Sequence, residues 1–295
     1  MVKKNIKTQS RNPSLDLLRI ILTILVVNVH IRIITGIKEN FLEPFTWYTV
    51  PIFIIMSFFF TSNKPLALRI KRLLLPLFFW SLVGFIIHPN LLSVKNIFLQ
   101  VLTGHVVNTP LYYLVLLILF TTINWLINYL PIHFRIVIYS FIILVALNLE
   151  YSSSNYNFFS PMITVFEKSL GRFTELIKYV PIGLVFGYLS KKINNIVFFI
   201  LSVIFSILFL FVSNIPQPPD FHFSGLKILT GSIVIFSLII GLSRFRFNEK
   251  INIFINSFGK YSFGVYLSHY LLFETILKIN PSLKSFISIY QIPFL

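Results

Sequence analysis

The first apolar stretch of the chain carries Arg19 and His30, two side chains whose types suit anion binding and proton exchange and whose spacing places them on one helix face. Eleven residues make almost three helical turns, so both side chains lie on one helix face, about 16 Å apart along the axis. Asp16, three residues before Arg19, is expected to form an ion pair with it. An imidazole exchanges protons near neutral pH and a guanidinium binds phosphate. Taken alone, however, Arg19 also fits an interfacial arginine, and His30 a hydrogen-bonded packing histidine.

A second pair of cations, Arg69 and Arg72, directly precedes the apolar stretch that begins at Leu73. Arginines three residues apart share a helix face and can hold a phosphate by bidentate hydrogen bonds. A basic flank also marks the cytoplasmic end of a membrane span, so the pair by itself reads as a topology signal. We expect the pair to lie opposite Arg19 at the same membrane depth, and that placement favours an anion site.

The elements that position these residues are membrane helices. Of the 295 residues, 56% are apolar and only 12% are charged, and the apolar residues fall into long continuous stretches that argue against a barrel of alternating strands. Each stretch is long enough, or nearly so, to cross a hydrocarbon core of about 30 Å. We therefore predict an all-α polytopic membrane protein with about nine to ten transmembrane helices in one bundle, formed by residues 15–295 behind a basic cytoplasmic tail, residues 1–14. The expected spans are 15–35, 47–61, 73–87, 111–130, 132–149, 176–190, 196–213, 226–243 and 261–279, and residues 282–295 begin a tenth.

The distribution of charge predicts the orientation of the chain. Twenty-five Lys and Arg against nine Asp and Glu give a net charge of +16, and the basic residues gather in the loops that lie inside if the N-terminus is cytoplasmic. No basic cluster sits on a soluble module, so nucleic acid is not expected as a partner. The absence of cysteine excludes thiolate chemistry. The two longer outer segments, residues 89–109 and 151–172, are each placed to cover a site.

The remaining titratable residues offer little further chemistry. His88, His105, His133 and His222 fall in loops or at span ends without an acidic residue at metal-ligand spacing, so they are read as solvated or interfacial and no metal is predicted. Glu274 lies about one turn beyond His269. It is expected to provide a polar wall or to pair with that histidine, and a structural ion pair is the favoured interpretation.

In five motifs the chain resembles the acyltransferase type 3 family of bacterial inner-membrane proteins. Their order and spacing agree with the predicted topology along nearly the whole chain. Phe58, Tyr112 and Tyr270 depart from the family pattern, which usually has glycine, tryptophan and proline at these places. The motifs are Leu15-Asp16-Leu17-Leu18-Arg19 with His30, Val50-Pro51-Ile52-Phe53 up to Ser57, Arg69 with Arg72, Tyr112-Tyr113-Leu114, and Gly259-Lys260-Tyr261-Ser262 with Tyr266-Leu267-Ser268-His269.

The resemblance implies an O-acyltransferase that takes acetyl or another short acyl group from cytoplasmic acyl-CoA. The acceptor would be a hydroxyl of an extracytoplasmic polysaccharide or glycolipid, and no tightly bound cofactor is expected. The arginines would bind the donor phosphates, and the pantetheine arm would run through a channel between helices to His30, the general base. The residues carried over are catalytic His30, donor-binding Arg19, Arg69 and Arg72, and supporting Asp16, Ser57, Tyr113, Tyr266, His269 and Glu274.

Two other classes of function stay open from the residues alone. Several long spans with internal polar residues also suit a transporter or flippase for a polysaccharide or lipid intermediate. The departures from the family pattern equally suit a non-catalytic membrane partner of a glycan synthase. Covalent transfer of an acyl group separates the first reading from both alternatives.

Overall fold

The computed structural model describes residues 12–35, 42–60, 65–152, 171–214, 225–243 and 248–280, and this part of the chain is helical without a strand. The basic tail before residue 12, the segment 282–295 and most of the outer segment 151–172 lie outside it. Residues 171–177 are also helical. The elements are α1 Pro13–Thr35, α2 Glu43–Thr46, α3 Thr49–Phe59, α4 Leu66–Ile87, η1 Pro89–Leu91, α5 Val94–Thr103, η2 Thr109–Leu111, α6 Tyr112–Ile127, α7 Ile132–Ser152, α9 Tyr179–Leu189, α10 Asn195–Val212, α11 Gly225–Leu242 and α12 Glu249–Ile279.

The helices have the length and surface of a membrane protein. Four apolar spans are long enough to cross a bilayer, Pro13–Ile31, Leu66–Ile87, Asn195–Val212 and Gly225–Leu242, and shorter apolar helices accompany them. The long helices α4 and α10 expose large apolar side chains such as Phe79 and Phe211 along their outer faces. Apolar surface of that extent is rare on soluble proteins and matches contact with lipid. Each predicted span coincides with a helix, which confirms the all-α membrane fold.

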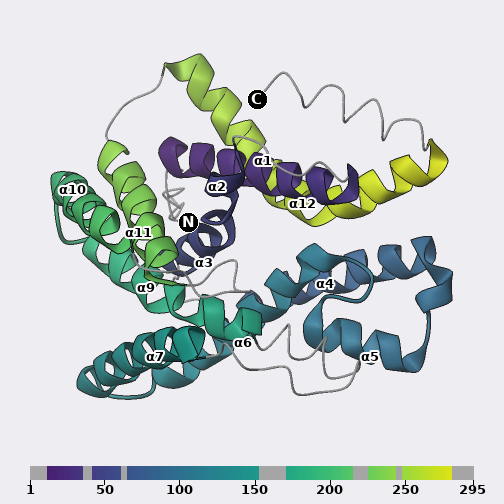
Figure 1. Ribbon diagram of the computed structural model, residues 1–295, viewed down its shortest axis with the longest axis horizontal. Helices are drawn as coiled ribbons and strands as arrows, with labels where there is room; N and C mark the ends of the chain where they lie inside the picture. Colours follow the sequence, from purple (N-terminus) through teal and green to yellow (C-terminus); the bar gives the residue numbers. More distant parts are fainter. Residues whose placement is uncertain are drawn as a thin grey trace, which may run out of the picture.

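The helices pack in pairs that lie far apart in the sequence. In Figure 1, α1 lies along α12, α10 lies beside α11, and α4, α5 and α6 gather on the opposite side of the molecule. The remaining close pair joins α3 to α9. Because α1, α3, α4, α6 and α12 meet near the centre, motifs from most of the chain reach one region.

Two glycines bring α9 against α3. A Cβ added to Gly183 would meet the carbonyl oxygen of Ile55, and one added to Gly187 would lie 2.6 Å from the carbonyl oxygen of Phe59. Small residues four apart let membrane helices approach closely, so their backbones gain van der Waals contact without a hydrophobic driving force. This contact fixes the position of α3, and with it the position of Ser57, which α3 carries.

Gly259 has the same effect between α1 and α12. A Cβ at Gly259 would lie 2.7 Å from the Cβ of Asp16, so the two helices touch at that turn. Three residues further along α12, the carbonyl of Ser262 accepts a hydrogen bond from the Thr23 hydroxyl at 3.5 Å. The late motif of the sequence is therefore set directly beside the opening one.

The predicted outer segment 89–109 contains a helix, α5, with clear local signals. The Ser93 side chain accepts a hydrogen bond from the amide of Asn96, and Gly104 ends the helix with a φ of 71°. Both are common helix-terminating choices, serine because its hydroxyl satisfies a free amide and glycine because it adopts the left-handed conformation without a Cβ clash. The loop reading of this segment was incomplete.

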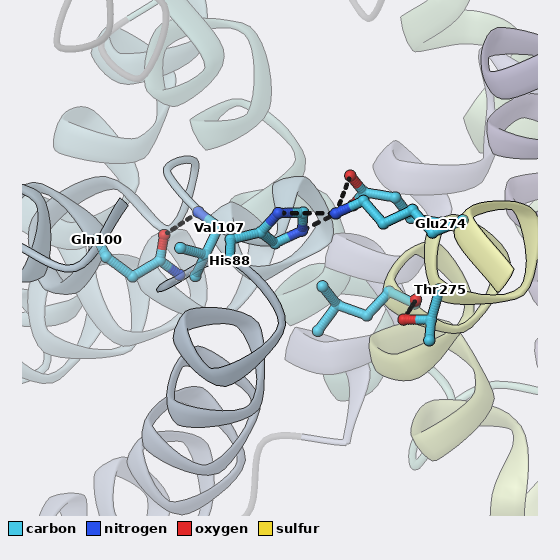
Figure 2. A network of polar contacts seen from close by, with 7 residues as sticks. His88, Gln100, Val107, Glu274 and Thr275 are labelled. Atoms are coloured by element: carbon cyan, nitrogen blue, oxygen red, sulfur yellow. Dashed lines mark hydrogen bonds and ion pairs between the residues drawn. The ribbon is translucent and has the colours of Figure 1, made fainter. Parts of the chain in front are cut away.

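Gln100 ties the outer segment together. This fully buried residue donates from Nε2 to the hydroxyl of Ser81 on α4 at 3.1 Å. Its Oε1 accepts from the backbone amides of Val106 at 2.7 Å and Val107 at 3.1 Å. Figure 2 shows the Gln100 side chain pointing to the backbone of Val107. One side chain thus satisfies a buried amide, that of Val107, and a partly buried amide, that of Val106, in a turn outside regular secondary structure.

Replacing Gln100 with leucine is expected to destabilise this segment strongly. The buried amide of Val107 would lose its acceptor at a cost of about 1–3 kcal/mol, and the partly buried amide of Val106 would add a smaller cost. Thermal unfolding of the purified protein, followed by tryptophan fluorescence, should show a lower melting temperature than the parent. Lys95→Leu on the exposed side of α5 is the matched control and should unfold like the parent. Equal melting temperatures for both variants would contradict this role of Gln100.

Candidate active site

The ion pair expected in the first helix is present. Nη1 of Arg19 donates to Oδ1 of the buried Asp16 at 2.7 Å. The same guanidinium donates from Nε to the sulfur of Met56 at 3.2 Å and lies over the ring of Phe60 at 5.0 Å. These contacts hold Arg19 toward α3 rather than toward lipid. The snorkelling interpretation of Arg19 is therefore not needed.

Arg69 and Arg72 share a cavity with Arg19. Both arginines lie within α4, because that helix begins at Leu66 directly after Pro65, earlier than the sequence predicted. The cavity has a volume of about 390 Å³ and opens between α1, α3, α4, α6 and α12. Its lining is Arg19, Phe53, Met56, Ser57, Phe60, Arg69, Arg72, Leu73, Tyr113, Leu117, Thr121, Gly259, Lys260, Ser262 and Phe263.

One departure from the family pattern contributes directly to this cavity region. Phe58, where a glycine would be usual, is buried, and the guanidinium of Arg69 lies 5.7 Å from its ring centre. An aromatic face attracts a cation, and this attraction offsets part of the free energy that an arginine loses when it leaves water. An aliphatic side chain at the same place would provide no such attraction. The substitution therefore gives Arg69 a defined position.

Ser57 and Tyr113 form the inner wall of the cavity. The Ser57 hydroxyl donates to the carbonyl of Phe53 at 2.8 Å, so the Tyr113 hydroxyl donates to Ser57 Oγ at 3.0 Å. The Tyr113 ring meets the ring of Tyr266 edge-on, with centres 5.4 Å apart. Two supporting residues of the sequence analysis thus touch each other, and a third stacks behind them.

His30 and His269 form a pair of imidazoles beyond Tyr266. Their ring centres are 4.9 Å apart, and the centre of Tyr270 lies 5.4 Å from that of His30. Nδ1 of His269 donates to the carbonyl of Tyr266 at 2.7 Å, which leaves Nε2 of that neutral ring as a proton acceptor. Among the described residues, buried Nε2 of His269 and buried Nδ1 of His30 have no hydrogen-bond partner. Unsatisfied buried acceptors are rare and mark places where a substrate or water completes the bonding.

The two ends are joined by packed rings and not by an open channel. The cavity with the arginines has no lining contribution from His30, and the ring of Tyr266 lies between Tyr113 and His269, at 5.4 and 6.1 Å. This cavity does not extend to His30, so the part of the expected passage next to the histidines lies beyond the packed rings. Large aromatic rings fill membrane interiors well, and sequence patterns do not show which rotamer they adopt.

Glu274 does not pair with His269, and it forms a structural ion pair, as the favoured interpretation had it, with other partners. Its Oε2 accepts from Nε2 of His88 at 3.1 Å, and its Oε1 lies 3.6 Å from Nζ of Lys278. The Lys278 ammonium also donates to Nδ1 of His88 at 3.1 Å. Figure 2 shows His88 and Glu274 pointing toward each other. The physical reason is the packing of α4 beside α12. It brings His88, the residue directly after α4, within hydrogen-bond distance of the Glu274 carboxylate. The cluster joins two helices and keeps Glu274 away from the histidine pair.

Three further polar residues were not singled out from the sequence. Lys260 and Thr121 line the cavity, and Asn108 is fully buried where its Nδ2 donates to the carbonyl of Leu267 at 3.1 Å. Lys260 had been placed on the cytoplasmic side and within the late motif, but no binding role had been assigned to it. Its position next to Gly259 in the late motif was the available signal.

Comparison with known families decides the class. A family model described as an acyltransferase domain matches residues 12–295. The chain belongs to this family. Neither the curated proteins nor the solved structures give a match. The molecule is thus a membrane acyltransferase that transfers groups other than aminoacyl groups, and in this acyltransferase the arginine cavity and the histidine pair are the polar features that the family motifs bring together.

Proposed function

We propose that this acyltransferase moves a short acyl group, such as acetyl, from cytoplasmic acyl-CoA to a hydroxyl of an extracytoplasmic polysaccharide or glycolipid. One observation supports the proposal: a cavity lined by Arg19, Arg69 and Arg72 lies on one side of the edge-on pair Tyr113 and Tyr266, and the imidazoles of His30 and His269 lie on the other side. Guanidinium groups bind phosphates, and buried imidazoles accept protons. The membrane orientation that puts basic loops inside supports entry of the donor from the cytoplasm.

The chemistry needs only groups that the chain supplies. His30 removes the proton from the acceptor hydroxyl as its oxygen attacks the thioester carbonyl. The carbon–sulfur bond then breaks, and the CoA thiolate takes the proton from the imidazolium, so the products are an O-acyl ester and CoA. The histidine pair suits the role of base because a buried ring nitrogen of each, Nδ1 of His30 and Nε2 of His269, has no hydrogen-bond partner among the described residues. Since Tyr113 and Tyr266 close the path, donor binding must move at least one of these rings.

A sided vesicle assay tests the proposal. Protein in sealed vesicles is given labelled acetyl-CoA trapped inside and a polysaccharide acceptor outside. We expect label on the external glycan. In the control, the cytoplasmic face of the protein points outward and both donor and acceptor are added outside. The acceptor then meets the wrong face of the protein, so no label should be transferred. Transport of unmodified glycan across the bilayer, with no label transferred, would support the flippase reading and reject the proposal.

Arg72→Met should weaken donor use selectively. Loss of a charge-assisted hydrogen bond to a phosphate costs about 1.5–3 kcal/mol, which raises the KM for acetyl-CoA by about 10- to 100-fold. The KM for the acceptor should stay unchanged, because Arg72 lines only the cavity at the proposed donor end. Steady-state kinetics with each substrate varied in turn measure both constants. Equal changes in the two constants would contradict a donor-binding role.

A further inference from the structure

The cations of the cavity fall into two pairs with different surroundings. Arg19 and Arg69 are partly buried, and each lies over a phenylalanine ring, Phe60 at the C-terminal end of α3 for Arg19 and Phe58 within α3 for Arg69. Arg72 and Lys260 are exposed. They come from α4 and α12 and line the same cavity. The cavity therefore has an inner and an outer cationic position.

The outer pair has the more available positive charge. Arg19 is already paired with Asp16 at 2.7 Å, and the cavity lining includes no Asp or Glu. Lys260 has an aromatic neighbour in Tyr261, whose ring centre lies 5.5 Å from Nζ. A site with this charge suits an anion with several phosphate groups better than one with a single phosphate.

The position of Lys260 follows from the helix contact next to it. Gly259 touches Asp16, so the turn of α12 that carries Lys260 is fixed against the turn of α1 that carries Arg19. A residue with a side chain at 259 would separate the helices and move Lys260 away from the cavity. The lysine is thus placed by backbone packing, although its own side chain is exposed.

The linear order of groups in acyl-CoA assigns a role to the outer pair. The thioester must point inward toward Tyr113, the diphosphate follows the pantetheine arm, and the 3′-phosphate of the ribose lies at the far end of the molecule. We propose that Lys260, together with Arg72, binds the 3′-phosphate of CoA at the cavity entrance. This inference rests on the proposed function. It means that the enzyme selects free acyl-CoA over thioesters of single-phosphate pantetheine, such as those on carrier proteins.

Binding of two nucleotides to the purified full-length protein tests this inference without an acceptor. Titration calorimetry in lipid nanodiscs compares CoA with 3′-dephospho-CoA. We expect the parent protein to bind CoA at least about tenfold more tightly, as a charge-assisted contact to one phosphate provides. Lys260→Met should remove most of this difference by weakening CoA alone. Unchanged binding of 3′-dephospho-CoA then shows that the variant is folded.

The matched control is Lys71→Met. Lys71 is exposed on α4 between the two cavity arginines, carries the same charge and does not line the cavity. This variant should keep the full preference for CoA, so a loss there would indicate a general charge effect and overturn the assignment. Equal affinities of the parent for both nucleotides, or equal losses in Lys260→Met, would also overturn it. If neither nucleotide binds the parent protein, the proposed function fails as well, and the two failures are distinguished.

Discussion

Acyl transfer is expected to fall by about 10²- to 10⁴-fold when His30 is replaced by glutamine, the range that general-base catalysis supplies. Glutamine retains hydrogen-bonding capacity and nearly the same volume, but it cannot take up a proton at neutral pH. The KM for acetyl-CoA should change little, because His30 lies outside the arginine cavity. The measurement is labelled transfer in vesicles at saturating donor.

Two variants make this result specific. His133→Gln alters an exposed histidine on α7 and should leave transfer unchanged. His269→Gln removes the other imidazole of the pair, and we expect a smaller loss because that ring is bound by the carbonyl of Tyr266 and supports His30. Full activity in His30→Gln together with an inactive His269→Gln would contradict this prediction and would identify His269 as the base.

Gly183→Leu is expected to destabilise the protein by about 3 kcal/mol or more, since overpacking against backbone has no easy relaxation. The new side chain would meet the carbonyl oxygen of Ile55 and force α9 away from α3. Ser57, Phe58 and Phe60 would shift with α3, so transfer should be lost even in protein that stays in the membrane. Survival of folded protein during heating in detergent, measured by size-exclusion chromatography, reports the stability.

Gly264→Leu is the matched control for this substitution. A Cβ at Gly264 meets no atom within 4 Å, and the position is exposed on α12. That variant should elute and melt like the parent. Similar losses in both variants would show that any leucine for glycine exchange harms these helices, and the close contact of α3 with α9 would then not be the cause.

The helical class and the candidate site residues were predictable to different degrees. Long apolar stretches define membrane helices because backbone groups in lipid must be satisfied within the segment, so the fold class followed from composition and continuity. The i, i+3 pair of Asp16 and Arg19 also followed from helical spacing alone. The meeting of Arg19, Arg69 and Arg72 was predicted from topology, and the structure places them in one cavity.

What sequence could not supply were the long-range partners of polar side chains. A structural ion pair was the favoured interpretation of Glu274, but the only candidate partner that the sequence offered was His269, and its actual partner His88 lies 186 positions away. Gly183 and Gly187 carried a visible small-residue spacing, yet only the structure shows that α3 is the helix they contact. The closed arrangement of Tyr113 and Tyr266 depends on side-chain rotamers, which no periodicity encodes.

The packed rings of Tyr113 and Tyr266 have a consequence for the cell's energy supply. A protein that hands a reactive group from one side of a bilayer to the other risks opening a route for protons and small ions, which would dissipate the membrane potential. Here the aromatic wall separates the wet cationic entrance from the imidazoles. The two rings pack in the space between the cavity and the imidazoles. In the transfer proposed above, the donor arm would take up the space of any ring that it displaces, so the barrier to protons and ions would be kept while the rings are apart.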